Sequence, residues 1–188
     1  MLTMMPMAAC DGSNADPILP EQPGQPGNSD GGDEDDSTDP TNPIPGGNGR
    51  YLVLYCSRTG STERMAQQIQ QTLDCDILEV EPQTPYESDY NGMLNRAQEE
   101  LAAIRQGNYP AIKTSVEDFG NYDIVFVGYP IWYGSMATPM QTFLHNHASK
   151  LAGKRIALFA SSGSSGISAS VDEARTFCSG ATFTETLL

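Results

Sequence analysis

From residue 51 onward, short apolar runs alternate with segments that have the period of an amphipathic helix. Runs such as Tyr51–Tyr55 and Ile124–Val127 are apolar throughout, which is typical of strands buried on both faces. Strands of this kind, each followed by a helix, predict a parallel sheet covered by helices on both faces. We expect strands at 51–55, 76–80, 124–127, 156–160 and 182–188, and helices at 62–72, 91–106, 136–147 and 168–178.

The predicted fold class is therefore α/β, a doubly wound five-stranded parallel sheet. The last strand reaches the end of the sequence, at residue 188. A further helix would be needed to cover the sheet face shared with the first helix, so we expect the C-terminal helix to be missing.

Residues 1–49 differ in composition from residues 50–188. They hold nine acidic residues and no Lys or Arg, whereas residues 50–188 hold fifteen acidic and ten basic residues. The two parts thus contribute −9 and −5 to the net charge of −14. Segment 11–49 is rich in Gly, Pro, Asp, Asn and Ser, which predicts a disordered tether in front of a folded domain at 50–188. An acidic chain repels phosphates, so we expect no nucleic-acid partner.

The first nine residues are apolar, end in two alanines and precede Cys10. This resembles the end of a bacterial lipoprotein signal peptide, in which the cysteine becomes acylated. The stretch is short and lacks the basic n-region of a secretory signal. Two interpretations remain: an exported domain held to a bacterial membrane by a lipid on Cys10, or an ordinary N-terminus of a cytoplasmic protein. No later segment is apolar for long enough to span a membrane.

Three segments that follow predicted strands carry residues suited to a ligand, which in an open α/β sheet binds at the carboxyl ends of strands. The first is Ser57-Arg58-Thr59-Gly60-Ser61-Thr62, at the start of a predicted helix. Its hydroxyls, glycine and free helix amides suit a phosphate, although Ser and Thr are also common helix caps. No Walker lysine and no GxGxxG pattern accompanies it.

The second segment is Gly128-Tyr129-Pro130-Ile131-Trp132-Tyr133-Gly134, which places the only Trp of the chain in a predicted loop. Such aromatics either stack on a flat ligand or fold back onto the core. The third segment, Ser161-Ser162-Gly163-Ser164-Ser165-Gly166, could bring backbone amides to a ring edge or be a plain loop. It does not satisfy the G-x-S-x-G pattern of serine hydrolases.

Together these segments resemble the bacterial flavodoxin-like branch of the flavodoxin family, with its YxSRTGxT and GxPIW[WY]G loops. The resemblance covers about 51–188 and implies strand order 2-1-3-4-5 and FMN as the cofactor. It implies that Ser57, Arg58, Thr59, Gly60, Ser61 and Thr62 surround the FMN phosphate. It further implies that Pro130, Ile131, Trp132, Tyr133 and Gly134 flank the isoalloxazine, with Trp132 or Tyr133 stacked on it. Ser161, Ser162, Gly163 and Gly166 would line the pyrimidine side.

The resemblance implies electron transfer through FMN, without a catalytic side chain of the protein. Two alternatives stay open: an FMN-dependent NAD(P)H:quinone-type oxidoreductase, and an anchored binding module without catalytic activity. The partners would be redox proteins or small molecules such as NAD(P)H and quinones. Cys56, Cys75 and Cys178 have apolar neighbours and no ligand spacing, so we expect them to be buried rather than to bind a metal.

Overall fold

The computed structural model describes residues 50–188. The predicted signal-like segment 1–10, Cys10 and the predicted tether 11–49 lie outside the described residues. The strands are β1 (Tyr51–Tyr55), β2 (Asp76–Glu79), β3 (Ile124–Trp132), β4 (Ser135–Met136), β5 (Arg155–Ser161) and β6 (Thr182–Leu187). The helices are α1 (Ser61–Leu73), α2 (Tyr90–Ile104), α3 (Thr138–His147) and α4 (Ser168–Phe177).

The main sheet has the strand order β2-β1-β3-β5-β6, and all four neighbouring pairs are parallel. The short β4 pairs only with the end of β3. When β4 is left out of the numbering, the order is the predicted 2-1-3-4-5. The predicted fold class is confirmed.

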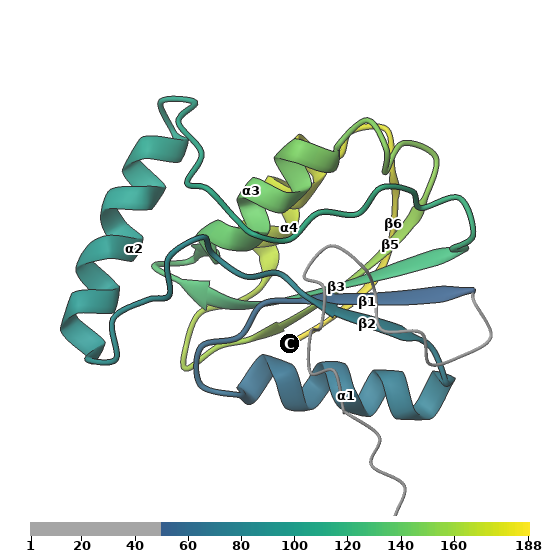
Figure 1. Cartoon of the computed structure of the whole chain (residues 1–188), viewed down its shortest axis with the longest axis horizontal. Coiled ribbons are helices and arrows are strands. Elements are labelled where there is room, and N and C mark those ends of the chain that lie inside the picture. Colours follow the sequence, from purple (N-terminus) through teal and green to yellow (C-terminus); the bar gives the residue numbers. More distant parts are fainter. Residues whose placement is uncertain (1–49) are drawn as a thin grey trace, which may run out of the picture. The chain divides into compact units, whose positions relative to one another are not determined.

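Helices cover both faces of the sheet, with α1 on one face and α3 and α4 on the other (Figure 1). Val53 of β1 and Ala66 of α1 belong to the core on the α1 face, whereas Leu54 and the helix residue Phe143 belong to the larger core on the opposite face. Helix α2 stands beyond the end of the sheet toward which β3 points (Figure 1). This position makes α2 a neighbour of the loops at the carboxyl ends of the strands.

The β3 strand is longer than predicted, and this changes the setting of Trp132. The strand continues through Trp132, which pairs with Ser135 of β4, so Trp132 ends a strand and the prediction that it lies in a loop is wrong. Tyr133 and Gly134 form the two-residue connection, with φ of 51° and 79°. Positive φ at both positions is the geometry of a type I′ hairpin turn.

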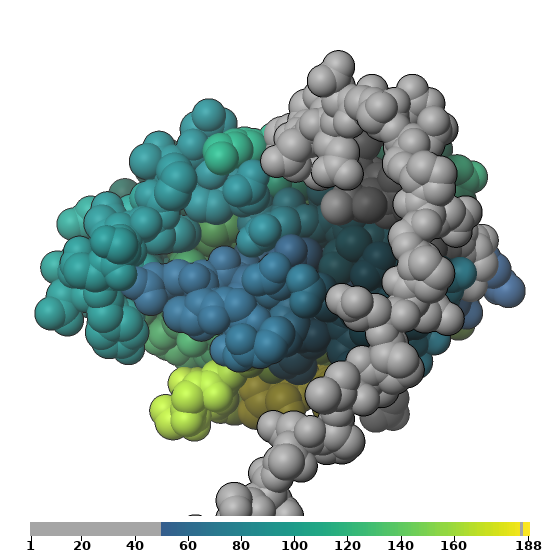
Figure 2. Space-filling view, turned by 60° about the horizontal axis from the view of Figure 1, so that its bottom comes forward, coloured from purple at the N-terminus to yellow at the C-terminus, as the bar shows by residue number. Residues whose placement is uncertain are grey.

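The α1 face is open beside the last strand. Among the described residues no helix follows β6, and a groove of about 350 Å³ lies between α1 and Leu187. Figure 2 shows this side of the domain, with α1 in blue, α2 in teal beside it and β6 in yellow below. Within residues 50–188, no helix is both long and apolar enough to cross a bilayer.

The three cysteines of the described part are buried, as expected, and they form no disulfide with one another. Burial raises the pKa of the Cys75 and Cys178 thiols to about 11. The thiols therefore stay protonated and pack as small apolar groups.

Candidate functional site

A cavity of about 550 Å³ opens at the carboxyl ends of β1, β3 and β5. Its walls come from all three segments singled out in the sequence, and also from the first turns of α2. The predicted residues that line it are Ser57, Arg58, Thr59, Ser61, Thr62, Pro130, Ile131, Trp132, Tyr133, Ser161, Ser162 and Gly163. Gly60, Gly134 and Gly166, which were also predicted, do not line it.

The loop between β1 and α1 is shaped around Gly60. This residue has φ of 79° and is the N-cap of α1, so the cap has no side chain to satisfy the first amides of the helix. The Gly60 N–H donates to Ser57 Oγ at 3.1 Å, which closes the loop on itself. The amides of a helix N-terminus and several hydroxyl groups thus meet at one end of the cavity, an arrangement that suits an anion.

A partly buried hydrogen bond joins this loop to the third segment. Thr62 Oγ1 and Ser161 Oγ lie 2.8 Å apart, and Thr62 is 1% exposed. The bond joins the first turn of α1 to the last residue of β5. It therefore fixes the distance between two of the loops that line the cavity.

Two arginines accompany the loop, and they have different surroundings. The Arg58 Nη2 lies 3.0–3.3 Å from the main-chain carbonyl oxygens of Glu87, Ser88 and Asp89. Its guanidinium therefore anchors the loop to the segment that precedes α2. The Arg64 Nη2 lies 3.4 Å from Ser61 Oγ, which puts a second cation beside the hydroxyls. Arg64 was not among the predicted site residues.

The three aromatic residues of the second segment have three different environments. Tyr129 is fully buried, and its hydroxyl lies 3.1 Å from Ser170 Oγ, so for this residue the core alternative is correct. Trp132 lines the cavity but is only 8% exposed, and its ring packs edge-to-face on Tyr86 at 5.1 Å. Tyr133 is 54% exposed at the cavity wall, with its hydroxyl 3.4 Å from the Leu94 carbonyl oxygen.

The fourth wall, from α2, was missed by the sequence interpretation. It consists of Tyr90, Met93 and Leu94. The segment after β2 has neither a glycine-rich nor a hydroxyl-rich pattern that would single it out in the sequence. Its one local signal is Asp89, which caps α2 by accepting a hydrogen bond from the Gly92 N–H at 2.6 Å.

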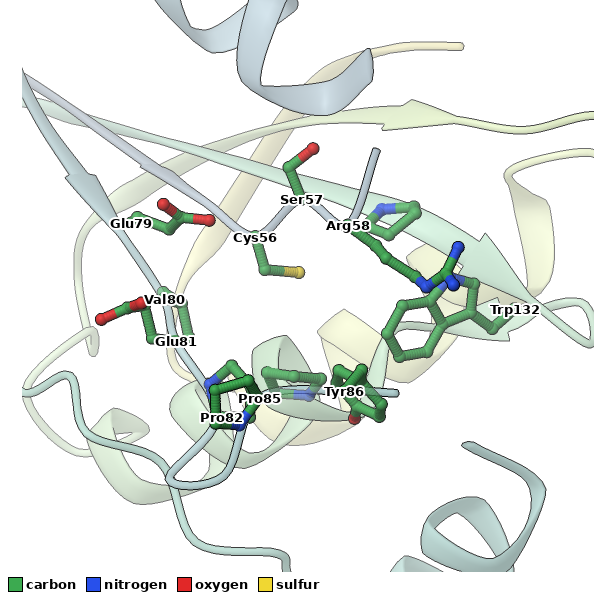
Figure 3. Close-up of a pocket in the computed structure, with 12 residues that line it drawn as sticks. Cys56, Ser57, Arg58, Glu79, Val80, Glu81, Pro82, Pro85, Tyr86 and Trp132 are labelled. Atoms are coloured by element: carbon green, nitrogen blue, oxygen red, sulfur yellow. The ribbon is translucent and has the colours of Figure 1, made fainter. Parts of the chain in front are cut away.

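A second, smaller cavity of about 230 Å³ adjoins the first and shares Ser57, Arg58, Pro130 and Trp132 with it. Figure 3 shows the Cys56 sulfur pointing into this space, with Glu79 on one side and Trp132 on the other. Burial, reinforced by Glu81 and Glu63, raises the pKa of Glu79 to about 7. Burial also raises the pKa of the Cys56 thiol, so this sulfur is protonated and is a poor nucleophile.

The lining of the larger cavity suits a bound ligand. Among residues 50–188 no group of three His, Cys, Asp or Glu residues is placed to hold a metal ion. The larger cavity is lined by hydroxyl-bearing residues and Arg58 near the start of α1, and by the aromatic residues Trp132 and Tyr133. Such a cavity can hold a planar ring that carries an anionic tail.

A family model described as flavodoxin matches residues 50–188. The chain belongs to the flavodoxin family. A candidate flavoprotein from Bacteroides eggerthii DSM 20697 has 34% identity and a TM-score of 0.65, over 74% of this chain and 87% of that one. A candidate flavoprotein from Bacteroides uniformis ATCC 8492 has 29% identity and a TM-score of 0.64, over 76% and 90%.

A third flavodoxin-like neighbour was solved with a ligand. The flavoprotein from Lactobacillus acidophilus NCFM, in complex with FMN, has 27% identity and a TM-score of 0.63, over 73% of this chain and 91% of that one. No curated protein matches the chain. Membership of the flavodoxin family agrees with the strand order and with the position of the larger cavity.

Proposed function

We propose that the larger cavity binds FMN and that the domain transfers electrons through it. The observation that carries the proposal is the cavity itself, in which the hydroxyl-rich start of α1 and the Trp132–Tyr133 wall belong to one space. Its volume of about 550 Å³ is within the range of about 300–1,000 Å³ typical of ligand and cofactor sites. The Lactobacillus acidophilus neighbour with FMN supports this choice of cofactor.

The chain's own residues would have three tasks. The first amides of α1 and the hydroxyls of Ser57, Thr59 and Ser61 would bind the phosphate, with Arg64 as the nearby cation. Trp132 and Tyr133 would contact the ring on one side, and Ser162 and Gly163 would approach it from the loop after β5. Bound FMN would supply the redox chemistry, because no side chain of the site is a redox centre.

The test is a titration of the purified protein with FMN and with riboflavin, which lacks the phosphate. We expect quenched flavin fluorescence and a protein-bound yellow colour with FMN, and much weaker binding of riboflavin. Arg64→Gln should weaken FMN binding and leave riboflavin binding unchanged, because only FMN carries the anion. Arg175→Gln is a matched control, since Arg175 is an exposed helix arginine beside Asp172 on α4. Absence of FMN binding would refute the proposal.

Two variants assign the ring contacts. Trp132→Ala and Tyr133→Ala should each weaken binding of both flavins, and the larger loss identifies the residue that stacks on the ring. If neither variant changes flavin affinity, the ring does not lie against this wall.

A kinetic assay separates an electron carrier from an oxidoreductase. If the protein is a carrier, NADPH should be oxidised in the presence of a quinone only when a separate reductase is added, because the reductase takes the electrons from NADPH and passes them to the carrier. Turnover by the protein alone would favour the NAD(P)H:quinone-type alternative. A flavin-free binding module would show neither flavin binding nor turnover.

We also propose that the domain is exported and anchored through a lipid on Cys10. The support is the apolar stretch before Cys10 and the acidic, Gly- and Pro-rich segment after it. Mass spectrometry of the N-terminus from the native cell tests this, because acylation would add the mass of a lipid to a chain that begins at Cys10. A chain that still begins at Met1, without a lipid, would refute it.

A further inference from the structure

The segment between β2 and α2 is fastened from two sides. On one side, Arg96 of α2 donates to the carbonyl oxygens of Thr84 and Pro85, each at 2.9 Å. On the other side, Arg58 contacts the carbonyl oxygens of residues 87–89. Arg58 belongs to the loop 57–62, called the phosphate loop below because it is proposed to bind the FMN phosphate. Two guanidinium groups thus bind the main-chain carbonyl oxygens of five of the six residues 84–89, all except Tyr86. The backbone around Tyr86 is therefore fixed relative to both α2 and the phosphate loop.

Tyr86 is at the centre of a polar cluster behind the cavity wall. Its hydroxyl contacts Glu100 Oε2 and lies 2.7 Å from Thr138 Oγ1. Glu100 also accepts a hydrogen bond from Arg96 Nε at 2.8 Å, and the Arg96 guanidinium lies 4.3 Å from the centroid of the Tyr86 ring. The Arg96 and Glu100 side chains are 22% and 12% exposed. Each group of the cluster is thus held by at least two others.

The Tyr86 ring is the contact between this cluster and Trp132. The two rings meet edge-to-face, with an interplanar angle of 80°. Trp132 is one of the four residues that line both the larger and the smaller cavity. A rotation of the indole would therefore change the shape of both spaces, and the edge-to-face contact with Tyr86 opposes such a rotation.

We propose that Arg96 and Glu100 are positioning residues that hold Trp132 in place through Tyr86. They keep Trp132, which lines the larger cavity, at a fixed position relative to the phosphate loop. Arg58 of that loop contacts the segment that contains Tyr86, so the same segment connects Trp132 to the loop. The consequence for flavin binding rests on the proposed function above. The consequence for Trp132 does not depend on any ligand.

The physical argument is that the cluster is well satisfied and costly to leave incomplete. Glu100 has Arg96 at one carboxylate oxygen and the hydroxyls of Tyr86 and Thr138 at the other. If one residue of the cluster is removed, the remaining half-buried polar groups lack a hydrogen-bond partner, so the cluster rearranges. Because Tyr86 carries the contact with Trp132, a rearrangement reaches the cavity wall.

Trp132 is the only tryptophan of the chain, so its fluorescence reports on this wall directly. The main variant is Tyr86→Phe, which removes the hydroxyl and keeps the ring. Its matched control is Tyr122→Phe, which loses a hydrogen bond of 2.7 Å to Asp76 at the opposite, amino end of the strands. Glu100→Gln is the second variant, since it removes the negative charge of the cluster at nearly constant volume and leaves the positive charge of Arg96.

The first measurement uses the flavin-free protein. We expect acrylamide to quench the fluorescence of Trp132 about twofold more efficiently in Tyr86→Phe and Glu100→Gln than in the wild type. The reason is that a less firmly packed indole ring is more accessible to the quencher. In Tyr122→Phe the quenching should remain at the wild-type value, even if this variant loses as much thermal stability as Tyr86→Phe. A merely structural role of Tyr86 would change the stability and leave the quenching unchanged.

The second measurement compares the two flavins. Both variants should weaken FMN and riboflavin by the same factor, about threefold to tenfold, because the ring wall changes and the phosphate contacts do not. Unchanged Trp132 quenching in both variants, or an equal change in Tyr122→Phe, would overturn the inference. A wild-type protein that binds no FMN would refute the proposed function alone, because the quenching data still decide whether the cluster positions Trp132.

Discussion

Replacing the left-handed glycine of the phosphate loop is expected to separate a backbone effect from a steric one. Gly60 has φ of 79°. An added Cβ would meet Arg64 Nη1 at 3.5 Å and Glu63 Oε2 at 3.6 Å, which is ordinary van der Waals contact. The neighbours can therefore accept alanine, and the penalty of Gly60→Ala should come from φ alone.

The size of this penalty follows from the cost of the left-handed region. The left-handed conformation costs a residue with a Cβ about 1–2 kcal/mol. The cost is smaller for Asn than for Ala, because the short polar side chain of Asn forms hydrogen bonds with the nearby backbone. Alanine also reduces the freedom of the unfolded chain, which stabilises the fold by about 0.4–1 kcal/mol. Gly166→Ala is the control for this second effect, because Gly166 has no left-handed φ and an added Cβ meets nothing within 4 Å. Relative to this control, Gly60→Ala should be about 1–2 kcal/mol worse.

Two assays are needed to measure the whole free-energy cost. The cost lowers the stability of the flavin-free protein if the loop is already formed there, and lowers the FMN affinity if the loop forms only when FMN binds. If the flavin-free loop keeps its conformation, urea unfolding of Gly60→Ala shows the whole loss. If the loop relaxes without flavin, unfolding changes little and FMN binding weakens about fivefold to thirtyfold instead. We expect the sum of the two losses to match the estimate, and Gly60→Asn to show a smaller sum than Gly60→Ala.

An equal sum for Gly60→Ala and Gly166→Ala would refute the reasoning, because the left-handed conformation would then have no energetic role. Equal sums for Ala and Asn would refute the conformational explanation of the penalty.

Three further changes test the packing, electrostatics and hydrogen bonding of the domain. Gly128→Ala places a Cβ 2.1 Å from Cζ of the buried Phe159, so overpacking should lower the free energy of unfolding by about 1–3 kcal/mol, and an unchanged urea midpoint would contradict this. Because the folded pKa of Glu79 is about 7 and its ordinary value is 4.5, the folded protein takes up a proton before the unfolded chain does as the pH falls. The stability should therefore rise as the pH falls from 8 to 5, which urea midpoints measured across this range would show. In Glu79→Gln this rise should be smaller. An equally steep rise in the variant would mean that other groups cause it. Thr62→Val removes the bond to Ser161 and should cost about 1 kcal/mol of stability in thermal unfolding, along with part of the FMN affinity, whereas a wild-type unfolding curve would show that the bond is not needed.

The sheet could be predicted because its signals are local and repeated. Apolar runs mark the central strands β1, β3 and β5, and helical periods separate the strands, so the order of elements follows from the sequence. The end of β3 could not be predicted in the same way. Pro130 argues against a strand interior, and Tyr133-Gly134 is not the Asn-Gly pair that usually marks a type I′ turn. The pairing of Pro130 with Ser161 of β5 overrides the first signal, and the pairing of Trp132 with Ser135 of β4 overrides the second.

The site was predictable as far as it depends on the loops themselves. The loops that follow β1 and β5 line one cavity together with the end of β3, which lies between these two strands, as expected for parallel strands whose carboxyl ends meet at one edge of a sheet. The contributions of Tyr90 and Leu94 depend on where α2 packs, which no residue of α2 reveals alone. The same holds for Trp132, whose partner Tyr86 lies 46 positions earlier in the printed sequence.

The hydrogen bond between Thr62 and Ser161 joins residues 99 positions apart. During synthesis the N-terminal part of a chain emerges first, so the phosphate loop leaves the ribosome long before its partner. Until β5 has emerged and paired with β3, one wall of the cavity does not exist. A flavin therefore has no complete site to enter on a growing chain, and cofactor capture becomes one of the last events in the maturation of the protein.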